Sequence, residues 1–268
     1  MLEPRKPSPS GGFGCLMLLI IILIILLLSS SSKGQNKPRH PHPPELTSSK
    51  EIVAEQNKVA ERLGVPIILD DEMLKEFTSE KTPDENRLVR LVNTPYCSVT
   101  RVNPQFRWTH QLVRDYIDDL SKRYYAISHE RLQIVSATRT LKWQKLMTTK
   151  WIYDKRGRRH RNRAYNPNAF IDTDNPDVTS LHTFALAFDI STKQMTPVLI
   201  MILQEILITD TKNTQNRVQV AEESIKIRHR HAHRRRGKRT TYTYTYSYRI
   251  IAYHCVIFNA SFLNLYSK

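Results

Sequence analysis

The chain is poor in cysteine and glycine, and its acidic residues are outnumbered by basic ones. Three cysteines in 268 residues exclude both a disulfide scaffold and a cysteine-rich zinc module. Seven glycines exclude a collagen-like or glycine-rich repeat. Hydrophobic residues still make up 40% of the chain, which is too many for a wholly disordered protein. The length fits one sizeable domain with extensions, or two small domains.

The longest apolar run lies near the N-terminus and predicts the compartment. Residues 15–28 contain no polar side chain. A spanning helix needs roughly 20 apolar residues, whereas a run of this length is typical of a signal-peptide core. We therefore expect residues 1–32 to be a signal peptide or signal anchor, and cleavage stays open. The chain would be exported, periplasmic or extracytoplasmic, and residues 13–28 would anchor it in the inner membrane if retained.

A linker and one main domain follow this segment. Residues 33–49 are rich in serine, proline and histidine, which predicts a flexible linker. We expect a domain over 50–239, with its core at about 85–233, and an atypical tail over 240–268. The alternation of Thr and Tyr in 240–248 leaves a terminal strand pair as the alternative for this tail. Capping signals predict helix starts at Ser48 and at Thr82.

Hydrophobic spacing gives the remaining elements and the fold class. It predicts an amphipathic helix within 106–125, a strand at 132–135, a buried helix at 197–208, and strands at 217–220 and 224–229. Helices beside a few strands, without regular βαβ alternation, indicate an α+β fold.

The positive charge is concentrated in two stretches. The chain has 41 Lys and Arg against 25 Asp and Glu, a net charge of +16. Residues 154–163 contain six of these cations and residues 226–239 contain eight. Such runs bind polyanions. For an exported protein we expect anionic cell-envelope polymers, and nucleic acid is the less favoured partner. A solvated loop is the plainest interpretation of 154–163.

Two short stretches contain the residues most suited to chemistry. The first runs from Ser136 to Gln144 and includes Arg139. The second contains His182 and Asp189, seven residues apart, with small or apolar residues between them. Imidazole and carboxylate are ligands that a catalytic zinc prefers, and a buried carboxylate needs a partner. The alternative is that His182 caps a turn and Asp189 caps the helix that follows.

Together the two stretches resemble a known enzyme family. The patterns S-x-[YT]-R-[ST]-x-x-x-Q and S-x-H-x-x-x-x-A-x-D resemble those of the zinc D-Ala-D-Ala metallopeptidases, including an uncharacterised exported bacterial branch. The resemblance covers about residues 85–233 and implies the Hedgehog/D,D-peptidase fold, a small antiparallel sheet with flanking helices.

The resemblance implies a role for each matching residue. His182 and Asp189 would bind Zn²⁺, and Arg139 would contact the scissile carbonyl oxygen or a substrate carboxylate. Ser136 and Gln144 would orient the substrate-binding loop around Arg139. The family usually has glycine where this chain has Ala185, a change that is tolerable if Ala185 keeps a negative φ.

The family also places a catalytic glutamate and a last zinc histidine on a late strand, often as E-x-W-H. This chain offers Glu222 or Glu223 as the general base. His229 is the favoured third ligand and His231 the second choice, and no tryptophan precedes either. In an extended strand these histidines and His233 share one side. The alternative is a His/Arg-rich surface tract.

Three functions follow from these patterns. The first is an exported zinc-dependent peptidase that cleaves peptidoglycan stem peptides, of the D,D- or L,D-carboxypeptidase type. The second is a catalytically inactive cell-wall-binding domain on the same fold. The third is a membrane-anchored basic protein that binds polyanions. An intact general base and third ligand would separate the first from the second.

Overall fold

The computed structural model describes Leu46 and residues 50–84, 86–166, 169–172, 178–213, 218–233 and 241–258. The expected signal or anchor segment and nearly all of the linker lie outside these residues. None of the helices in the described ranges has the length and apolar character needed to cross a membrane. The chain divides into the units Met1–Pro41 and His42–Lys268, and the fold below is that of the second unit.

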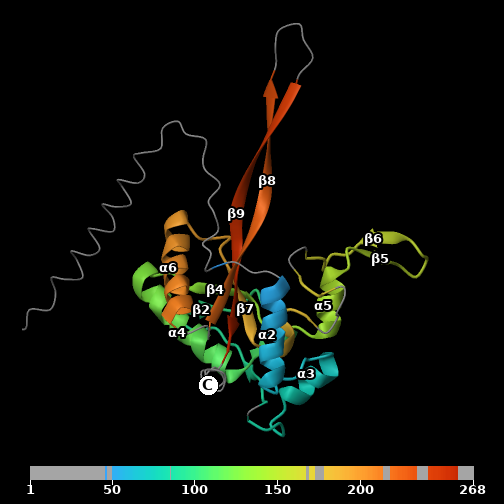
Figure 1. Cartoon of the computed structure of the whole chain (residues 1–268), viewed down its shortest axis with the longest axis vertical. Helices are drawn as coiled ribbons and strands as arrows, with labels where there is room; N and C mark the ends of the chain where they lie inside the picture. The colour runs from blue at the N-terminus through green and yellow to red at the C-terminus, as the bar shows by residue number, and fades with distance from the viewer. Residues whose placement is uncertain are drawn as a thin grey trace, which may run out of the picture. The chain divides into compact units, whose positions relative to one another are not determined.

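The described part of the chain is an α+β domain, as the sequence predicts (Figure 1). Its α-helices are α2 (Lys50–Arg62), α3 (Asp71–Phe77), α4 (Gln111–Ser128), α5 (Leu141–Thr148) and α6 (Pro197–Asn213). The strands are β1 (Val89–Arg90), β2 (Cys97–Ser98), β3 (Trp108–Thr109), β4 (Leu132–Ser136), β5 (Trp151–Tyr153), β6 (Arg159–Arg161), β7 (Ala187–Ser191), β8 (Val218–His233) and β9 (Thr241–Ile257). Two 3₁₀ turns, η2 (Pro104–Phe106) and η3 (Leu181–Phe184), complete the set.

A five-stranded sheet organises the domain, in the order β2-β4-β7-β9-β8. The β2–β4 pair is parallel and the other pairs are antiparallel. β9 lies between β7 and β8: residues 241–257 pair with β8, and residues 252–256 of these also pair with β7. The expected boundary between 239 and 240 therefore divides two paired strands, and the proposal of a separate tail over 240–268 is corrected for these residues.

One face of this sheet makes the main core. α4 and α6 pack on it, with Ile117 and Leu120 of α4 and Leu203 of α6 buried in the same cluster as Phe188 of β7 and Tyr253 of β9. Each fully buried side chain of this size contributes about 1.5–3 kcal/mol. Because side chains alternate along a strand, the neighbours Asp189 and His254 lie on the opposite face. That face carries the candidate site, and α2 lies on its side of the sheet (Figure 1).

The helix signals were only partly correct. A helix does follow Ser48, as α2, and α4 falls in the predicted amphipathic region. The predicted helix start at Thr82 is wrong, because backbone bonds from Asn86 and Arg87 to the Pro83 carbonyl close a turn there. The helix α3 instead begins after Asp70, whose carboxylate accepts from the backbone amides of Glu72 and Met73.

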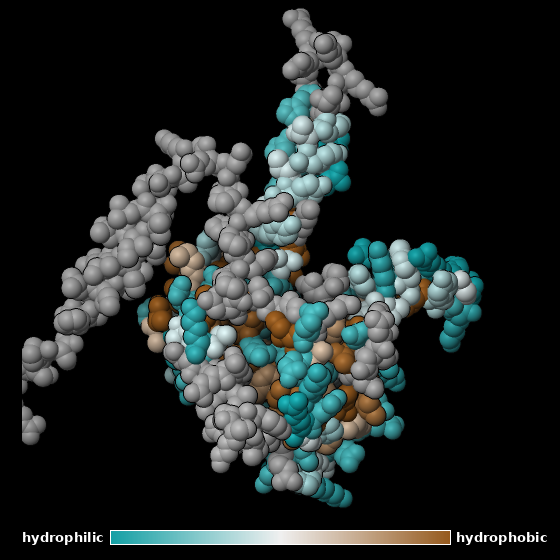
Figure 2. All heavy atoms as spheres, in the orientation of Figure 1, coloured by the Kyte–Doolittle hydropathy of each residue, from teal (hydrophilic) through white to brown (hydrophobic). Residues whose placement is uncertain are grey.

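β8 and β9 continue well beyond the sheet as a two-stranded ribbon, which we define as residues 224–233 and 241–250. Pairing with β7 involves only residues 252–256 of β9, whereas β8 and β9 pair as far as His233 and Thr241. In Figure 1 this ribbon extends away from the helices. Figure 2 shows it in teal and white, with the hydrophobic residues gathered over the body.

Candidate metal centre

The candidate site is built on one row of residues across three strands. Ser136 of β4 lies opposite Asp189 of β7, and Asp189 lies opposite His254 of β9. A register shift in β4 between Ile134 and Ser136 brings Ser136 into this row. His182 reaches the same place from η3, just before β7. The sheet register, and not local sequence spacing, therefore assembles the cluster.

His182, Asp189 and His254 form a possible metal-binding triad. Their ligand atoms all lie within 4.8 Å of one another. His182 Nε2 is 3.1 Å from Asp189 Oδ1, and His254 Nδ1 is 2.8 Å from the same oxygen. His182 is fully buried and Asp189 nearly so. Three side chains of two ligand types, imidazole and carboxylate, thus converge on one point, and the sequence-predicted pair His182 and Asp189 is brought together.

The surroundings of His182 fix how its ring is used. Its Nδ1 donates a hydrogen bond to the backbone carbonyl of Ala137, a tautomer assigned from this contact. Nε2 is then unprotonated and turned toward Asp189. Metal-binding histidines usually donate their second ring nitrogen in this way, which fixes the ring and makes the other nitrogen more basic.

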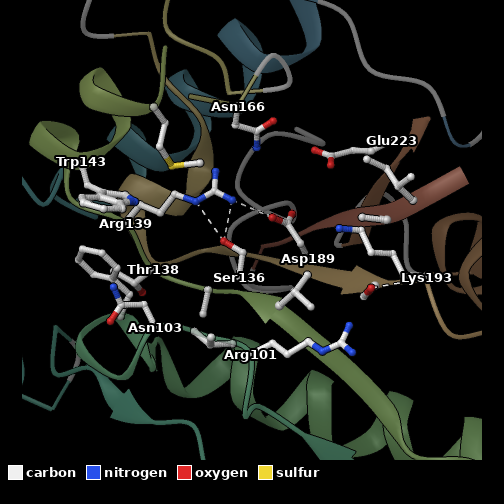
Figure 3. Close-up of a pocket in the computed structure, with 18 residues that line it drawn as sticks. Arg101, Asn103, Ser136, Thr138, Arg139, Trp143, Asn166, Asp189, Lys193 and Glu223 are labelled. Carbon is white, nitrogen blue, oxygen red and sulfur yellow. Dashed lines mark hydrogen bonds and ion pairs between the residues drawn. The ribbon is translucent and has the colours of Figure 1, made fainter. Parts of the chain in front are cut away.

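Arg139 is held beside Asp189 by three side chains, two of which, Ser136 and Asp189, are seen in Figure 3. Its Nη2 donates to Asp189 Oδ2 at 2.8 Å and to Ser136 Oγ at 2.6 Å, and its Nε donates to the same hydroxyl at 3.0 Å. Nη1 is 3.4 Å from Gln144 Oε1. The backbone amide of Arg139 also donates to the His182 carbonyl at 2.9 Å. The predicted residues Ser136 and Gln144 therefore bind Arg139 itself.

These contacts set the charges at the site. Burial lowers the pKa of His182 to about 4, and the Arg139 guanidinium acts in the same direction. Burial by itself would raise the pKa of Asp189, but its contacts with His182, His254 and Arg139 hold it well below the usual range. At neutral pH the site thus contains a neutral His182 and an ionised Asp189, the forms in which these residues bind metals.

The third ligand is not the one that the sequence suggested. His229 and His231 lie on the exposed ribbon, where their Nε2 atoms hydrogen-bond to Ser247 and Thr245. His254 pairs with Ala221, so His229 is eight residues farther along β8, or roughly 26 Å at about 3.3 Å per residue. The expectation that His229 or His231 completes the site is corrected, and His254 takes that position.

A local signal for His254 existed in the sequence. It is one of few polar residues in the segment IIAYHCVIF, and a polar side chain in an apolar strand needs a partner. The register that supplies Asp189 as this partner is not visible in the sequence, because the two residues are 65 positions apart.

The two candidate bases lie on different faces of β8. Ala221 pairs with His254 and Glu223 pairs with Ala252, so Glu223 shares the face of His254 and Asp189. Glu222 pairs with Tyr253, whose side chain belongs to the core face. Figure 3 shows the Glu223 carboxylate directed toward the space in front of Asp189 and Arg139. The geometry therefore favours Glu223 over Glu222 as the candidate general base.

Two cavities meet at the site. A cavity of about 560 Å³ is lined by Arg139, Asp189 and Glu223, with Arg101, Lys193 and Trp143 farther out. A smaller one of about 200 Å³ lies on the other side of Arg139, beside His182, His254 and Gln56 of α2. Glu223 and Arg139 line both cavities, whereas Glu222 lines only the smaller one. The larger cavity has room for part of a peptide beside the triad.

Ala185 differs from the expectation that it keeps a negative φ. It follows η3 in the left-handed conformation, with φ of 54°. The Thr109 hydroxyl and the His110 amide both donate to its carbonyl, which holds the backbone in place between the two ligands. The tight turn that glycine usually makes is therefore made here by alanine, at a cost in strain.

Comparison with known proteins places the chain in no family. No protein-family model, no curated protein and no solved structure matches it. The arguments for function thus rest on the two sequence patterns and on the geometry of the site.

Proposed function

We propose that the chain is an exported zinc-dependent peptidase that cleaves peptidoglycan stem peptides, of the D,D- or L,D-carboxypeptidase type, with the Hedgehog/D,D-peptidase fold. The observation that carries the proposal is the convergence of His182, Asp189 and His254 beside Arg139. In the family that the sequence resembles, a histidine, an aspartate and a late-strand histidine bind zinc next to an arginine. The late-strand histidine here is His254.

The donor set fits zinc. Two imidazoles and one carboxylate are a ligand set of catalytic zinc sites, which keep a further position open for water or substrate. When bound, the ion would act as a Lewis acid and would lower the pKa of a coordinated water toward 7. The hydrogen bond from His182 to Ala137 and the ion pair from Arg139 to Asp189 would orient two of the three ligands.

Glu223 is the general base in this proposal. Its carboxylate lines the cavity on the same face as Asp189 and His254. It would take a proton from the attacking water and deliver it to the nitrogen of the leaving amine. Glu222 has the weaker case, because it pairs with Tyr253 on the other face of the strand.

Arg139 would stabilise the developing negative charge on the scissile carbonyl. Its contacts with Ser136, Gln144 and Asp189 use four of the five N–H groups of the guanidinium. Among the described residues, one Nη1–H is therefore left for a substrate oxygen. A fixed charge in a nearly dry site is most effective in this role, and Arg139 is only 8% exposed.

The metal site is tested by measuring zinc content in matched histidine variants. His254→Ala and His182→Ala are each expected to lose the near-stoichiometric zinc of the parent protein. His231→Ala is the control and is expected to keep it, because His231 lies on the ribbon. Zinc that persists in His254→Ala while disappearing from His231→Ala would overturn the assignment.

Activity is tested separately, by digesting muropeptides and reading the products by mass spectrometry. We expect loss of a terminal residue with the parent protein, and a loss of about 10²-fold or more in rate for Glu223→Gln with zinc retained. Glu222→Gln is the control and is expected to be close to the parent. Equal losses in the two variants would contradict the choice of Glu223.

An inactive wall-binding domain on the same fold is the second candidate. It is favoured by one observation, that the position three residues before His254 is Ile251, where the family's E-x-W-H pattern has glutamate. In that case the parent protein would bind zinc and muropeptides and release no product.

A further inference from the structure

The ribbon carries charge that the proposed site does not use. Its two strands contain four Lys and Arg, three histidines and no acidic residue, and the sequence that connects them, residues 234–240, contains five more Lys and Arg. Arg228 and Arg230 of β8 are exposed. The residues of β9 that they pair with lie outside the part of β9 that pairs with β7. The ribbon is therefore a positively charged arm; Figure 1 shows that it projects from the domain, and Figure 2 shows its hydrophilic surface.

The two faces of this arm differ in chemistry. On one face Arg228 lies over the ring of Tyr244, and Arg230 lies over the ring of Tyr242, each guanidinium carbon 3.6 Å from the ring centre. We call this the Arg/Tyr face. The other face carries His229, His231 and His233, which hydrogen-bond to Ser247, Thr245 and Thr243. The two stacked arginines thus share one face, whereas Arg249 lies on the histidine face and donates to the Lys193 carbonyl.

The stacking prepares the arginines to bind phosphate. A guanidinium lying flat on a ring is held in one plane, so less side-chain entropy is lost when its N–H groups bind an oxyanion. Planar guanidinium groups bind phosphate through two parallel hydrogen bonds. Arg228 and Arg230 are two residues apart on one strand, or roughly 6.6 Å. They form a short row of phosphate-binding groups.

The same motif recurs on the second exposed hairpin. Arg159 of β6 lies 4.2 Å over the ring of Trp151 of β5, and all three residues of each strand are exposed. Two projecting hairpins therefore both present an arginine stacked on an aromatic ring. This repetition favours one kind of ligand, an extended polyanion that is bound at more than one point.

We propose that the Arg/Tyr face of the ribbon binds a linear polyol-phosphate chain, a phosphodiester polymer without bases. Proteins that bind single-stranded nucleic acid use aromatic rings as stacking platforms for bases. Here Arg230 and Arg228 each lie over one of the rings Tyr242 and Tyr244, which leaves these two rings less open to bases and favours phosphate contacts at this point. Two-stranded ribbons twist strongly, so a flat membrane would touch only part of one face, whereas a flexible chain can follow it.

This inference is independent of peptidase activity. The triad and the ribbon share β8 and β9, but no ribbon residue lines either cavity at the metal centre. Failure of one proposal would therefore leave the other standing. If both hold, the ribbon would keep the enzyme on the anionic polymer of the wall that it digests.

The test measures binding of the full chain, in nonionic detergent, to fluorescently labelled poly(glycerol phosphate). Arg228→Gln with Arg230→Gln is expected to weaken binding at least 10-fold at low salt. Arg228→Lys with Arg230→Lys keeps the charge but loses the planar, stacked guanidinium groups, so we expect binding to weaken about threefold. His229→Gln with His231→Gln alters the opposite face and is expected to bind within twofold of the parent at pH 8.

Competitors identify the polymer. Oligothymidylate with the same number of phosphates, and vesicles containing phosphatidylglycerol, are each expected to compete at least 10-fold less well than unlabelled poly(glycerol phosphate). Stronger competition by either would overturn the choice of ligand. Unchanged binding by the Arg→Gln pair would overturn the site. A far-UV circular dichroism spectrum and a urea unfolding midpoint equal to those of the parent serve as the check that each variant is folded, whether or not the protein binds zinc.

Discussion

Ala185 shows how one residue stores strain at the site. The left-handed conformation costs an alanine about 1–2 kcal/mol, yet Ala185 is fully buried and its carbonyl accepts two hydrogen bonds that fix it. The strain persists because β3, α4 and η3 all meet at this carbonyl. It lies between His182 and Asp189, so it helps set the path of the chain from one ligand to the other.

Replacing Ala185 with glycine tests this strain. Relief of strain is expected to offset the lost methyl contact, about 0.8 kcal/mol, and the larger backbone entropy of glycine. Ala185→Gly should therefore change the free energy of unfolding by less than about 1 kcal/mol in urea titrations. Ala187→Gly, equally buried but in β7, is the control and should lose about 1.5–2 kcal/mol. Equal losses would show that Ala185 is unstrained.

His110 predicts an acid-sensitive step in stability. Burial lowers its pKa in the folded protein to about 4, against about 6.5 in an unfolded chain. Below pH 6.5 the unfolded chain binds a proton that the folded chain does not, so stability is complete above pH 6.5 and falls toward pH 4. His182 acts in the same direction in metal-free protein.

The measurement compares urea titrations of chelator-treated protein from pH 7 to pH 4.5. His110→Gln is expected to lose stability less steeply than the parent, by up to about 1.4 kcal/mol per pH unit. His129→Gln, at an exposed position, is the control and should follow the parent curve. A His110→Gln curve parallel to that of the parent would contradict the assignment.

At the scale of elements, an ion pair fastens α4 to α6. Arg123 of α4 donates to both carboxylate oxygens of Asp210 in α6, at 2.8 and 2.7 Å. The Tyr116 hydroxyl donates to the same carboxylate at 2.6 Å. The Asp210 side chain is only 11% exposed, so its three contacts are better shielded from water than those of a surface pair.

Asp210→Ala is expected to lower the free energy of unfolding by about 2 kcal/mol, because it leaves Tyr116 and Arg123 without this acceptor. The estimate allows for the partial exposure of Arg123, at 37%. Asp119→Ala is the control, since Asp119 binds the same arginine at 2.8 Å but is 63% exposed. It should cost no more than about 0.5 kcal/mol. Equal effects in urea titrations would refute the role of Asp210.

The way the elements are paired also explains which elements and site residues could be predicted from the sequence. The apolar residues of α4 repeat at helical spacing, and this pattern depends only on neighbours along the chain. The pair His182 and Asp189 was also found, because both lie in one short segment next to a strand. His254 was not found, since it meets Asp189 through the pairing of β7 with β9, which no local pattern encodes. His229 and His231 lie on one side of a strand, as predicted, but this part of the strand belongs to the ribbon and lies far from the metal centre.

At the scale of the whole molecule, composition was a poor guide to the domain boundary. The alternating segment TTYTYTYSY differs from the rest of the chain, which suggested a tail. Its composition follows instead from its position. In the ribbon β9 pairs with β8 alone, and both faces of this pair are in contact with solvent. The same strand becomes apolar from Ile250, where it enters the sheet and Tyr253 and Cys255 join the core. The same strand is thus solvent-exposed in the ribbon and buried in the sheet.

This division predicts that the distal ribbon can be removed without unfolding the domain. Ile225 pairs with Arg249, so an Asn-Gly turn can replace residues 226–248 in register. None of the described residues in that range belongs to a buried cluster. The free energy of unfolding should change by less than about 1 kcal/mol, since exposed residues contribute little.

Val220→Ala is the matched control, because Val220 lies on the same strand inside the sheet and is buried in the main core. It should cost about 1–2 kcal/mol in the same urea titration, although it removes far less of the chain. Zinc content should be unchanged in the shortened protein, because His182, Asp189, His254 and Glu223 all remain. A shortened protein that is folded but has lost its zinc would show that the ribbon supports the metal centre, and the two functions would then have to be treated as one.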